Sequence, residues 1–428
     1  MSELILHINA ADFQQEVLES DKAVIVDFYS EDCAPCEVLA PIYEKMAEKY
    51  AGHIKFVKIF RQANRDLATK LGVSSSPTIL FYNHGQEVGT RLNGFLNKPQ
   101  VRKAIEEVLG DVLPAEEMQR VDCDILILGA GPAGLSSAIY ASRAKMTTVV
   151  IDESVPGGQA ASTYHIANYP GTLGVVRGKE VINNMIKQAQ SFGAKIDHLK
   201  EIFEVKLTGK IKYVRTEDTE YYAKAVIITS GAKPRALPAE GADEFKGRGV
   251  HYCATCDGSM YQDRKIVVIG GGNSAVEEAV FLTKFASHVT IIHQFDNFQA
   301  SNTAQEEALH NPKIDVIWDS EVRKVNGEGH ALTSVVIENL KTKQTIEVPT
   351  EGAFVYIGTE PMSQMYQGQV EMDQWGYIVA SEDTKTNLEG VFAAGDIRTK
   401  PIRQVVTAAS DGAVAGILAE RYIVINKS

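Results

Sequence analysis

The sequence predicts an α/β protein, because one local pattern, a short apolar strand followed by a distinctive turn and a helix, occurs three times. Residues 22–30 lead into a turn with two cysteines, whereas 124–128 and 265–269 each lead into a glycine-rich turn. Runs rich in Val and Ile that pass directly into a helix are typical of sheets covered by helices. The length of 428 residues is sufficient for about three such units.

Charge, hydropathy and cysteine content exclude several classes of protein. The net charge is -12 and no basic run occurs, so a nucleic acid partner is not expected. No apolar stretch approaches the roughly 20 residues of a membrane span, and residues 1–12 lack the pattern of a signal peptide. The five cysteines are too few for a secreted disulfide framework. We therefore expect a soluble, cytoplasmic protein that does not bind membranes.

The first unit is expected at residues 1–110 and contains Cys33-Ala34-Pro35-Cys36 between the strand and a helix at 35–50. Two thiols at this spacing can close a disulfide within one turn, and the free N–H groups at a helix start stabilise a thiolate. The pair is therefore interpreted as redox-active. A structural pair or half of a zinc site is the alternative, but no second pair of ligands lies in this segment, so no metal is expected. Further strands are predicted at 55–60, 78–82 and 87–91, and a helix at 98–109.

This unit resembles thioredoxin in the order and spacing of four motifs, which are Val26-Asp27-Phe28, Cys33-x-Pro35-Cys36, Ser76-Pro77-Thr78 and Asn93-Gly94. The resemblance implies a thioredoxin fold in which Cys33 is the exposed nucleophile and Cys36 the resolving thiol. It also implies that Asp27 is a buried proton acceptor and that Pro77 is a cis-proline facing the disulfide. Asp32 replaces the Trp that the family usually has before the first cysteine. Since carboxylates disfavour a nearby thiolate, the redox potential of the pair does not follow from the resemblance.

A linker at 111–120 precedes a second unit, whose first strand is followed by Gly129-Ala130-Gly131-Pro132-Ala133-Gly134, a helix, and a second strand ending at Asp152. Glycines at this spacing allow a tight turn and a close approach of a pyrophosphate to the helix N-terminus, and the acid holds a ribose hydroxyl. The segment is therefore predicted to bind a dinucleotide. Cys123, which precedes the first strand, is interpreted as a small buried filler.

The remaining motifs of this unit resemble those of the low-molecular-weight thioredoxin reductases. They are Gly157-Gly158-Gln159, Asn168-Tyr169-Pro170-Gly171, Thr229-Ser230-Gly231, Ala394-Gly395-Asp396 and Arg403-Gln404. The resemblance implies that they bind FAD together with the first glycines, with Asp396 on the ribityl chain and Arg403 and Gln404 near the isoalloxazine. Because the last motifs follow the first only after a long insertion, the FAD-binding domain is expected at 121–233 and 362–428.

The inserted segment, expected at 234–361, carries a second fingerprint, Gly270-Gly271-Gly272-Asn273-Ser274-Ala275, between a strand and a helix. The resemblance implies two Rossmann-like domains in all, with this one binding a pyridine nucleotide through these residues and His293. Gln294, Phe295 and Gln299 stand where the family has arginines around the 2'-phosphate of NADPH. Losing charge-assisted contacts weakens that nucleotide. NADH, weak use of NADPH, another electron donor, or a domain kept only for its shape are all compatible with the sequence.

The inserted segment also contains Cys253-Ala254-Thr255-Cys256-Asp257-Gly258, which matches the thioredoxin reductase motif throughout. The resemblance implies that Cys256 lies nearest the flavin, that Cys253 attacks the client disulfide and that Asp257 is the general acid and base. Electron transfer from a flavin to a disulfide needs a ring-facing cysteine, and onward exchange needs a thiolate with a proton source. His251 is expected at the surface.

Nearly the whole chain thus resembles a fusion of thioredoxin with a low-molecular-weight thioredoxin reductase. The fusion implies a thioredoxin-disulfide reductase that passes electrons from NADH, NADPH or another donor through FAD and the second cysteine pair to the first pair, and then to client protein disulfides. A homodimer is expected. The alternatives are a reductase dedicated to a peroxiredoxin, as in the alkyl hydroperoxide reductase flavoprotein, a ferredoxin-fed reductase, a dithiol oxidase that uses oxygen, and a non-catalytic redox sensor or binding module. The intact cysteine pairs and Asp257 argue against the last of these.

Overall fold

The structure is a computed structural model that describes residues 4–31, 33–94, 96–110, 118–163, 166, 168–247, 249–328 and 331–426. The side chains of Ala34, Ser162, Thr255 and Cys256 lie outside the described part. The chain divides into two compact units. The first comprises Met1–Ala161, His165–Gly231 and Met362–Ser428, and the second comprises Ser162–Tyr164 and Ala232–Pro361.

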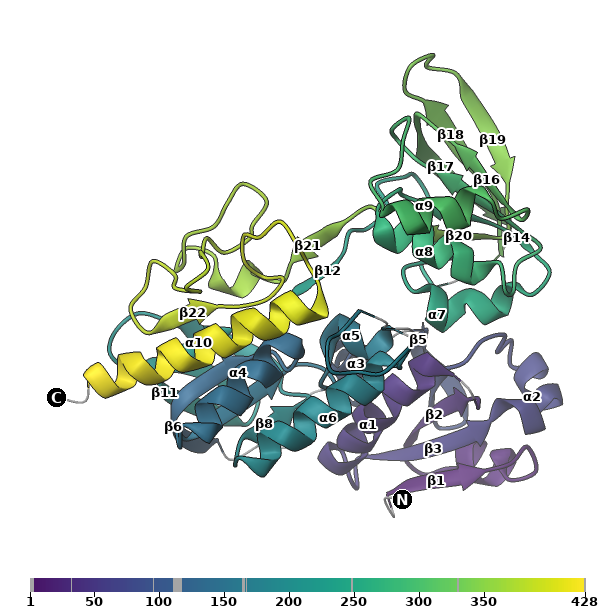
Figure 1. Cartoon of the computed structure of the whole chain (residues 1–428). Coiled ribbons are helices and arrows are strands. Elements are labelled where there is room, and N and C mark those ends of the chain that lie inside the picture. Colours follow the sequence, from purple (N-terminus) through teal and green to yellow (C-terminus); the bar gives the residue numbers. More distant parts are fainter. Residues whose placement is uncertain are drawn as a thin grey trace. The chain divides into compact units, whose positions relative to one another are not determined.

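The N-terminal segment of the first unit forms a five-stranded sheet (Figure 1). Its strands are β1 (Ile5–Ile8), β2 (Ala23–Tyr29), β3 (Ile54–Phe60), β4 (Thr78–Asn83) and β5 (Gln86–Asn93). They lie in the order β1-β3-β2-β4-β5, with β1, β2 and β3 parallel and with β4 and β5 antiparallel to their neighbours. The central strand β2 is buried along nearly all of its length, which explains its continuous apolar sequence.

Helices cover both faces of this sheet. On one face α1 (Ala34–Lys49) and α3 (Lys98–Leu109) share an apolar cluster with the sheet. On the other face lie the helical turn Gln14–Leu18 and α2 (Arg65–Lys70). Cys33 is the N-cap residue of α1, and Pro35 lies in the first turn of this helix. Proline is tolerated there because the N–H groups of a first turn have no hydrogen-bond acceptor within the helix. The α/β thioredoxin fold predicted for this segment is confirmed.

A second sheet, of seven strands, makes up the rest of the first unit. Its strands are β6 (Gln119–Leu128), β7 (Thr148–Asp152), β8 (Lys195–His198), β9 (Ile202–Lys206), β10 (Lys212–Thr216), β11 (Thr219–Ile228) and β22 (Val391–Ala393). Its helices are α4 (Pro132–Arg143), α5 (Gly158–Ser162), α6 (Gly178–Ser191) and α10 (Val405–Ile425). The order is β8-β7-β6-β11-β10-β9, with β22 beside β11, and α4, α6 and α10 cover one face (Figure 1).

The register of this second sheet brings distant motifs to one edge. β7, β6, β11 and β22 are parallel, and Leu128 pairs with both Ile151 and Ile228, which in turn pairs with Ala393. The residues that follow these strand ends open the motifs predicted to bind FAD. The carboxyl ends of parallel strands form the crevice where such sheets bind ligands. The register therefore explains how motifs so far apart in sequence come to lie at one edge.

The second unit contains a five-stranded parallel sheet and a three-stranded antiparallel sheet. The parallel strands are β13 (Val250–His251), β14 (Lys265–Ile269), β15 (His288–Ile292), β16 (Ile314–Ile317) and β20 (Gly352–Val355). The antiparallel strands are β17 (Ser320–Glu328), β18 (Ala331–Asn339) and β19 (Thr345–Pro349), and the helices are α7 (Ala254–Asp257), α8 (Asn273–Leu282) and α9 (Asn302–Leu309). The chain enters and leaves through an antiparallel ribbon of β12 (Ala232–Pro234) and β21 (Thr359–Pro361).

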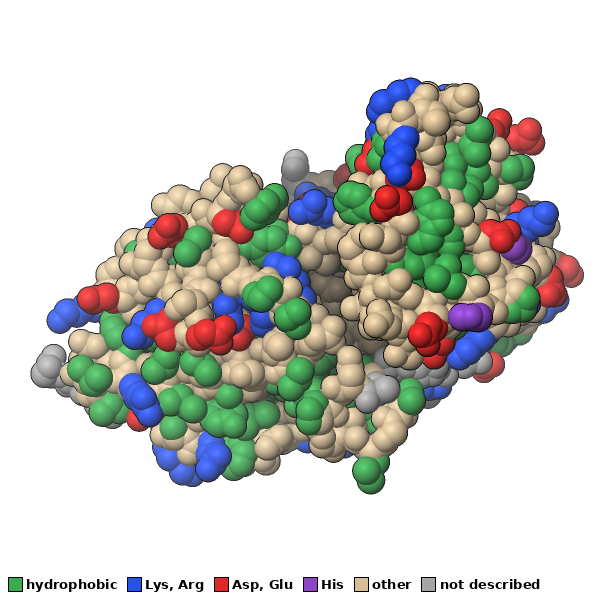
Figure 2. Space-filling view, turned by 45° about the horizontal axis from the view of Figure 1, so that its top comes forward, with side chains coloured by type: hydrophobic (Ala, Val, Ile, Leu, Met, Phe, Trp, Pro, Cys, Tyr) green, Lys and Arg blue, Asp and Glu red, His purple; other side chains and the backbone are tan. Residues whose placement is uncertain are grey.

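Charged side chains of both signs are interspersed on the face drawn in Figure 2 rather than gathered by sign. Within the described residues, no helix combines the length and the apolar character that crossing a bilayer requires.

The two Rossmann-like sheets and the thioredoxin fold predicted from the sequence are all present.

Candidate redox and cofactor sites

The first cysteine pair lies at the N-terminus of α1 in the disulfide form. The Cα atoms of Cys33 and Cys36 are 5.2 Å apart, and the backbone N–H of Cys36 donates to Sγ of Cys33 at 3.2 Å. The sulfur of Cys33 also lies 3.4 Å from the carbonyl oxygen of Ser76, whose peptide bond to Pro77 is cis. Cys33 is the more exposed of the two cysteines, and Cys36 is 9% exposed. An attacking thiolate can therefore reach the sulfur of Cys33 more easily.

Asp27 is a carboxylic acid buried in β2. It is 1% exposed, and its Oδ1 atom has no hydrogen-bond partner among the described residues. Burial raises the pKa of Asp27 to about 7, although Lys58, at 3.8 Å, acts in the opposite direction. A group with this pKa can hold or release a proton near neutral pH, as proton exchange with a buried thiol requires.

The raised pKa of Asp27 predicts a pH-dependent cost to stability. Between its ordinary pKa of 3.8 and about 7, the folded chain keeps a proton that the unfolded chain has lost. The domain is therefore destabilised as pH rises through this window, by about 4 kcal/mol above neutral pH. We expect Asp27→Asn to stabilise the thioredoxin segment by about 3–4 kcal/mol near pH 8 and hardly at all near pH 4.

Pulse proteolysis in urea at the two pH values measures this difference. Asp66→Asn, at an exposed position in α2, is the matched control and is expected to change stability little at either pH. An Asp27→Asn variant that gained equal stability at both pH values would show that the effect is one of packing.

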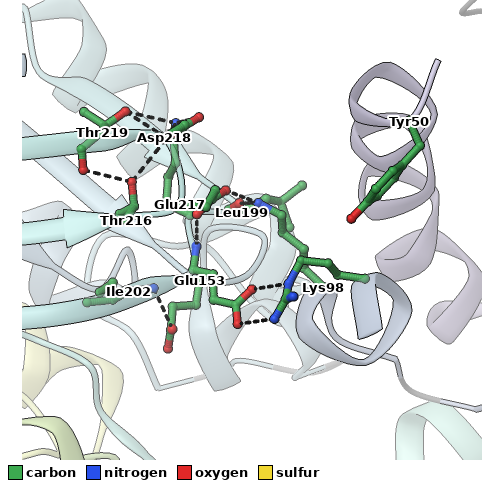
Figure 3. A network of polar contacts seen from close by, with 12 residues as sticks. Tyr50, Lys98, Glu153, Leu199, Ile202, Thr216, Glu217, Asp218 and Thr219 are labelled. Atoms are coloured by element: carbon green, nitrogen blue, oxygen red, sulfur yellow. Dashed lines mark hydrogen bonds and ion pairs between the residues drawn. The ribbon is translucent and has the colours of Figure 1, made fainter. Parts of the chain in front are cut away.

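The thioredoxin segment is joined to the second sheet of the first unit by a buried ionic contact (Figure 3). Lys98, at the start of α3, is 2% exposed, and its ammonium group donates to the carboxylate of Glu217 and to the carbonyl of Leu199. Arg102, one turn later, makes a bidentate ion pair with Glu201 at 2.9 and 3.0 Å. Such fork-shaped pairs fix orientation as well as distance.

Apolar packing completes this contact. Leu199 and Val155, from the second sheet's loops, belong to the apolar cluster beneath α1 and α3. Burial lowers the pKa of Lys98, while its pairing with Glu217 raises it. Removing one partner of a buried ion pair leaves an uncompensated charge, so the lysine and the glutamate specify this docking position together.

The first glycine-rich turn has the shape of a phosphate cradle. A Cβ atom on Gly129 would lie 2.5 Å from the carbonyl oxygen of Thr229, and one on Gly134 would lie 1.9 Å from that of Gly129. A Cβ on Gly131, by contrast, would meet no atom within 4 Å. Gly131 is the N-cap residue of α4 and offers no side chain to the first N–H groups of that helix. The turn therefore requires glycine and leaves room and donors for an anion.

Asp152 closes the other side of the cradle at the end of β7. Its Oδ2 accepts from the backbone N–H of Ala130 at 2.6 Å, and burial raises the pKa of its carboxyl group. Asn168 and Gln404, from two other motifs, are hydrogen-bonded to each other at 3.1 Å. Gly158 and Gln159 are the first residues of α5. Gly231 is the last residue of the segment His165–Gly231 of the first unit.

Two buried polar atoms beside this cradle have no partner among the described residues. They are Oδ1 of Asp396 and Nε of Arg403. Burial raises the pKa of Asp396, while Lys400 and Arg403 oppose this. Since buried polar groups are almost always hydrogen-bonded, these two atoms fit a ligand that donates to a carboxylate and accepts from a guanidinium, as the polyol and ring of FAD would.

A cluster around Asp411, which sequence reasoning missed, holds the loop of Asp396 in place. Asp411 accepts from the backbone N–H of Gly395 at 3.0 Å, from two nitrogens of Arg398 at 2.8 and 2.9 Å, and from Lys400 at 2.8 Å. Burial favours a raised pKa for Asp411, but these donors hold it below the ordinary value. No pattern in the sequence around Asp411 signals this role.

The second fingerprint has the same cradle geometry in the second unit. A Cβ on Gly270 would lie 2.2 Å from the carbonyl oxygen of Tyr356, whereas one on Gly272 would meet nothing within 4 Å. Gly272 precedes α8, which begins at Asn273 and continues through Ser274 and Ala275. The turn can therefore accept a pyrophosphate at the start of α8.

Residues 293–299 after β15, which the sequence predicts to face a 2'-phosphate, include no lysine or arginine. His293 is buried, its ring packs on Gly271, and its Nε2 lies 3.0 Å from Oε1 of Gln299. Burial lowers the pKa of His293, which favours the uncharged ring. Phe295 is 49% exposed. Lys341 lies near this segment, but its ammonium group pairs with Asp319 at 2.9 Å and with Asp296 at 3.7 Å.

The second cysteine pair begins α7. Cys253 is its N-cap residue and is disulfide-bonded, while the side chain of Cys256 lies outside the described residues. The backbone N–H of Ala254 donates to the hydroxyl of Tyr356 at 2.8 Å, and that of Asp257 donates to the carbonyl of Cys253 at 3.2 Å. Asp257 thus projects from the helical turn that carries the cysteine.

The surface position expected for His251 is wrong. The residue is 2% exposed, because β13 pairs with β20 and the imidazole stacks on Phe354 at 5.2 Å. Its Nδ1 lies 2.9 Å from Oδ2 of Asp257. The buried role expected for Cys123 is confirmed, since burial raises the pKa of its thiol to about 12 and holds it in the unreactive protonated form.

Comparison with known proteins agrees with this arrangement. Residues 123–412 match the pyridine nucleotide-disulphide oxidoreductase family, and residues 4–107 match thioredoxin. The chain therefore belongs to the pyridine nucleotide-disulphide oxidoreductase family. A thioredoxin domain precedes the residues that match this family. Membership makes it an FAD-dependent disulfide oxidoreductase and implies a pyridine nucleotide as well.

Its relatives cover the part of the chain after the thioredoxin domain. The chain is 46% identical over 309 residues to a thioredoxin reductase of Peptoclostridium acidaminophilum, covering 71% of this chain and 98% of the relative. It is 47% identical over 300 residues to a "34.2 kDa protein in rubredoxin operon" of Clostridium pasteurianum, covering 70% and 97%. The crystal structure of Lactococcus lactis thioredoxin reductase matches with a TM-score of 0.69 and 38% identity, covering 71% and 99%. The predicted fusion of thioredoxin with a reductase of this type is confirmed.

Proposed function

We propose that this chain is a protein-disulfide reductase that reduces its own thioredoxin domain and, through it, client protein disulfides. The observation that carries the proposal is that one chain contains two disulfide-bonded cysteine motifs, each at a helix start, together with a cradle in which Oδ1 of Asp396 and Nε of Arg403 have no partner among the described residues. The proposal assigns 1–110 to thioredoxin, 111–120 to the linker, 121–233 with 362–428 to FAD, and 234–361 to the nucleotide and the second pair.

FAD, when bound, accepts a hydride from a donor and delivers two electrons to a disulfide. The Cys253 disulfide takes up these two electrons and two protons and becomes a dithiol. Asp257 removes the proton from Cys253, whose thiolate attacks the sulfur of Cys33 and releases Cys36 as a thiolate. Asp27 supplies the proton that Cys36 needs. Cys256 then gives up its proton and attacks Cys253, which restores the Cys253–Cys256 disulfide. Cys33 leaves as a thiolate and takes up this proton, so the reduced thioredoxin pair is freed.

The short linker gives this exchange a kinetic advantage. A tether of about ten residues holds donor and acceptor at effective concentrations up to the millimolar range. The proposed partners are therefore the chain's own thioredoxin domain and, beyond it, client disulfides, among which a peroxiredoxin is one candidate. We also propose a homodimer, since Tyr140 on α4 and Ile417, Val424 and Ile425 on α10 are exposed apolar side chains.

Cofactor content tests the first step of the proposal. The purified protein is expected to be yellow with one FAD per chain, because only the first cradle has the whole FAD motif set around it. The absorption spectrum and the nucleotide released on denaturation measure this content. A folded but colourless protein that added FAD did not restore would contradict the assignment.

The electron donor is expected to be NADH or NADPH without a preference for NADPH. Gln294, Phe295 and Gln299 provide no positive charge for a 2'-phosphate, and His293 is held neutral by burial. The measurement is the rate of anaerobic flavin bleaching by each nucleotide. An advantage of tenfold or more for NADPH, about 1.4 kcal/mol, would show that other residues bind the phosphate.

The same neutral segment favours a second candidate, a ferredoxin-fed reductase. If neither nucleotide bleaches the flavin but reduced ferredoxin does, this candidate replaces the first. Hydrogen peroxide production without any response to nucleotide would instead indicate a dithiol oxidase.

A further inference from the structure

Three polar side chains, of which His251 and Tyr261 are buried, lie in a line close in sequence to the second cysteine pair. His251 ends β13, Asp257 ends α7, and Tyr261 ends the helical turn Gly258–Tyr261. Nδ1 of His251 lies 2.9 Å from Oδ2 of Asp257, and Nε2 lies 2.7 Å from the hydroxyl oxygen of Tyr261. The side chains of His251 and Asp257 are 1% and 14% exposed. The imidazole therefore connects a carboxylate near solvent to a phenol in the core.

The hydrogen positions in this line follow from its chemistry. Burial, with Asp257 contributing, raises the pKa of Tyr261 far above its ordinary value, so its hydroxyl keeps its proton. The hydroxyl of Tyr261 can then donate to Nε2 of His251, and Nδ1 is the ring nitrogen that faces Asp257. Nδ1 makes no hydrogen bond of good geometry within the described residues, so its interaction with Asp257 is a close polar contact at 2.9 Å.

Aromatic packing fixes the imidazole in this orientation. The ring of His251 stacks on Phe354 with centroids 5.2 Å apart and planes 28° apart, and Tyr261 meets Phe354 edge-on at 5.5 Å. The ring can therefore neither turn away from Asp257 nor reach water without moving β20.

Other charged groups act on this line from the elements packed around it. Arg264 and Glu351, 3.5 Å apart, act on Tyr261 with opposite signs. Tyr356 contacts the backbone of Ala254, and burial together with Glu278 and Asp257 raises its pKa. The pKa of Glu278 is itself raised to about 7 by burial and by Glu277.

We propose that His251 is a positioning residue for Asp257, and that its contact with Oδ2 holds the carboxylate in place to exchange a proton with Cys253. This inference rests on the proposed function. When the thiol of Cys253 becomes a thiolate, its proton moves to Asp257, whose Oδ2 stays in contact with Nδ1 of His251. When the carboxyl group gives the proton back, Cys253 is a thiol again, and no electrons move in either step.

Two substitutions separate the effect of the donor at Nδ1 from the effect of the ring. His251→Asn places an amide N–H near Nδ1 but does not titrate, and His251→Phe keeps the ring on Phe354 but has no donor. The matched control is His288→Asn, because Nε2 of His288 lies 3.0 Å from Oδ2 of Asp315 on the surface of the same unit. Both test variants keep a side chain that fills part of the buried site.

The measurement uses the full chain with Cys33→Ser and Cys36→Ser. The reduced protein is treated with iodoacetamide from about pH 5 to pH 9, and mass spectrometry follows the alkylation of Cys253. The pH at which the alkylation rate reaches half of its maximum should shift in His251→Phe, which offers no donor to Asp257, and should stay near the wild-type value in His251→Asn. The control should match the wild type.

Disulfide reduction by the chain with all its cysteines gives the second readout. At the pH optimum His251→Phe is expected to lose about tenfold in rate, His251→Asn to recover most of that loss, and flavin reduction by dithionite to stay unchanged. A wild-type alkylation profile or an undiminished rate in His251→Phe would overturn the inference. If the wild type bleaches its flavin but reduces no disulfide, the proposed function fails, while the alkylation profile still decides the role of His251.

Discussion

Cys256→Ser is expected to abolish disulfide reduction while leaving flavin reduction by the donor intact. In the proposed relay, Cys256 is the sulfur that faces the flavin, so electrons have no other exit once it is replaced by a hydroxyl. The loss should reach a factor of about a thousand or more, since removing a covalent participant eliminates the step rather than weakening it. Stopped-flow bleaching measures the first half-reaction, and reduction of a protein disulfide measures the second.

The matched control is Cys123→Ala. Cys123 is a buried thiol whose raised pKa keeps it protonated, and it lies in β6, away from either motif in sequence. This variant should therefore retain the wild-type rate of both half-reactions. If Cys256→Ser still reduced disulfides at the wild-type rate, the order of the relay would be wrong.

The sequence predicted those features that depend on neighbouring residues. The glycines of both cradles, the cysteine motifs at helix starts and the strands that precede them follow short-range rules, and the structure contains each of them. The register of the second sheet then explains how motifs at 129–134 and 394–396 share one edge. These elements were predictable because each has a local steric requirement.

The features that the sequence did not reveal depend on partners brought together by folding. His251 lies in a strand of two residues, and it is buried by β20, about a hundred positions further along the chain. Lys98 is one basic residue among many in the sequence, and its burial depends on Glu217 in a distant turn. Asp411 likewise has no local pattern, because its cations lie before α10 rather than within it. From the sequence alone, polar residues of this kind are predicted at the surface, because the partners that bury them become neighbours only in the folded chain.

A chain with Cys36→Ser and Cys256→Ser is expected to trap Cys33 and Cys253 as a mixed disulfide. Each substitution removes the thiol that would resolve the intermediate, so the exchange stops after the first attack. Cys33 is the more accessible sulfur of its pair, and both Cys33 and Cys253 are N-cap residues, where helix N–H groups stabilise a thiolate. Proteolysis without reduction, followed by mass spectrometry, locates the bond after mild oxidation.

Adding Cys33→Ser to the same chain provides the control, and the cross-linked peptide should then disappear although Cys123 and Cys253 remain. Mixing chains labelled with heavy and light isotopes distinguishes a bond within one chain from a bond between two subunits, because only the latter gives a mixed-mass peptide pair. Either result supports the thioredoxin domain as the acceptor, since both require Cys253 to attack Cys33. Recovery of Cys33 as a free thiol, or joined only to added small thiols, would mean that this domain takes its electrons from another protein.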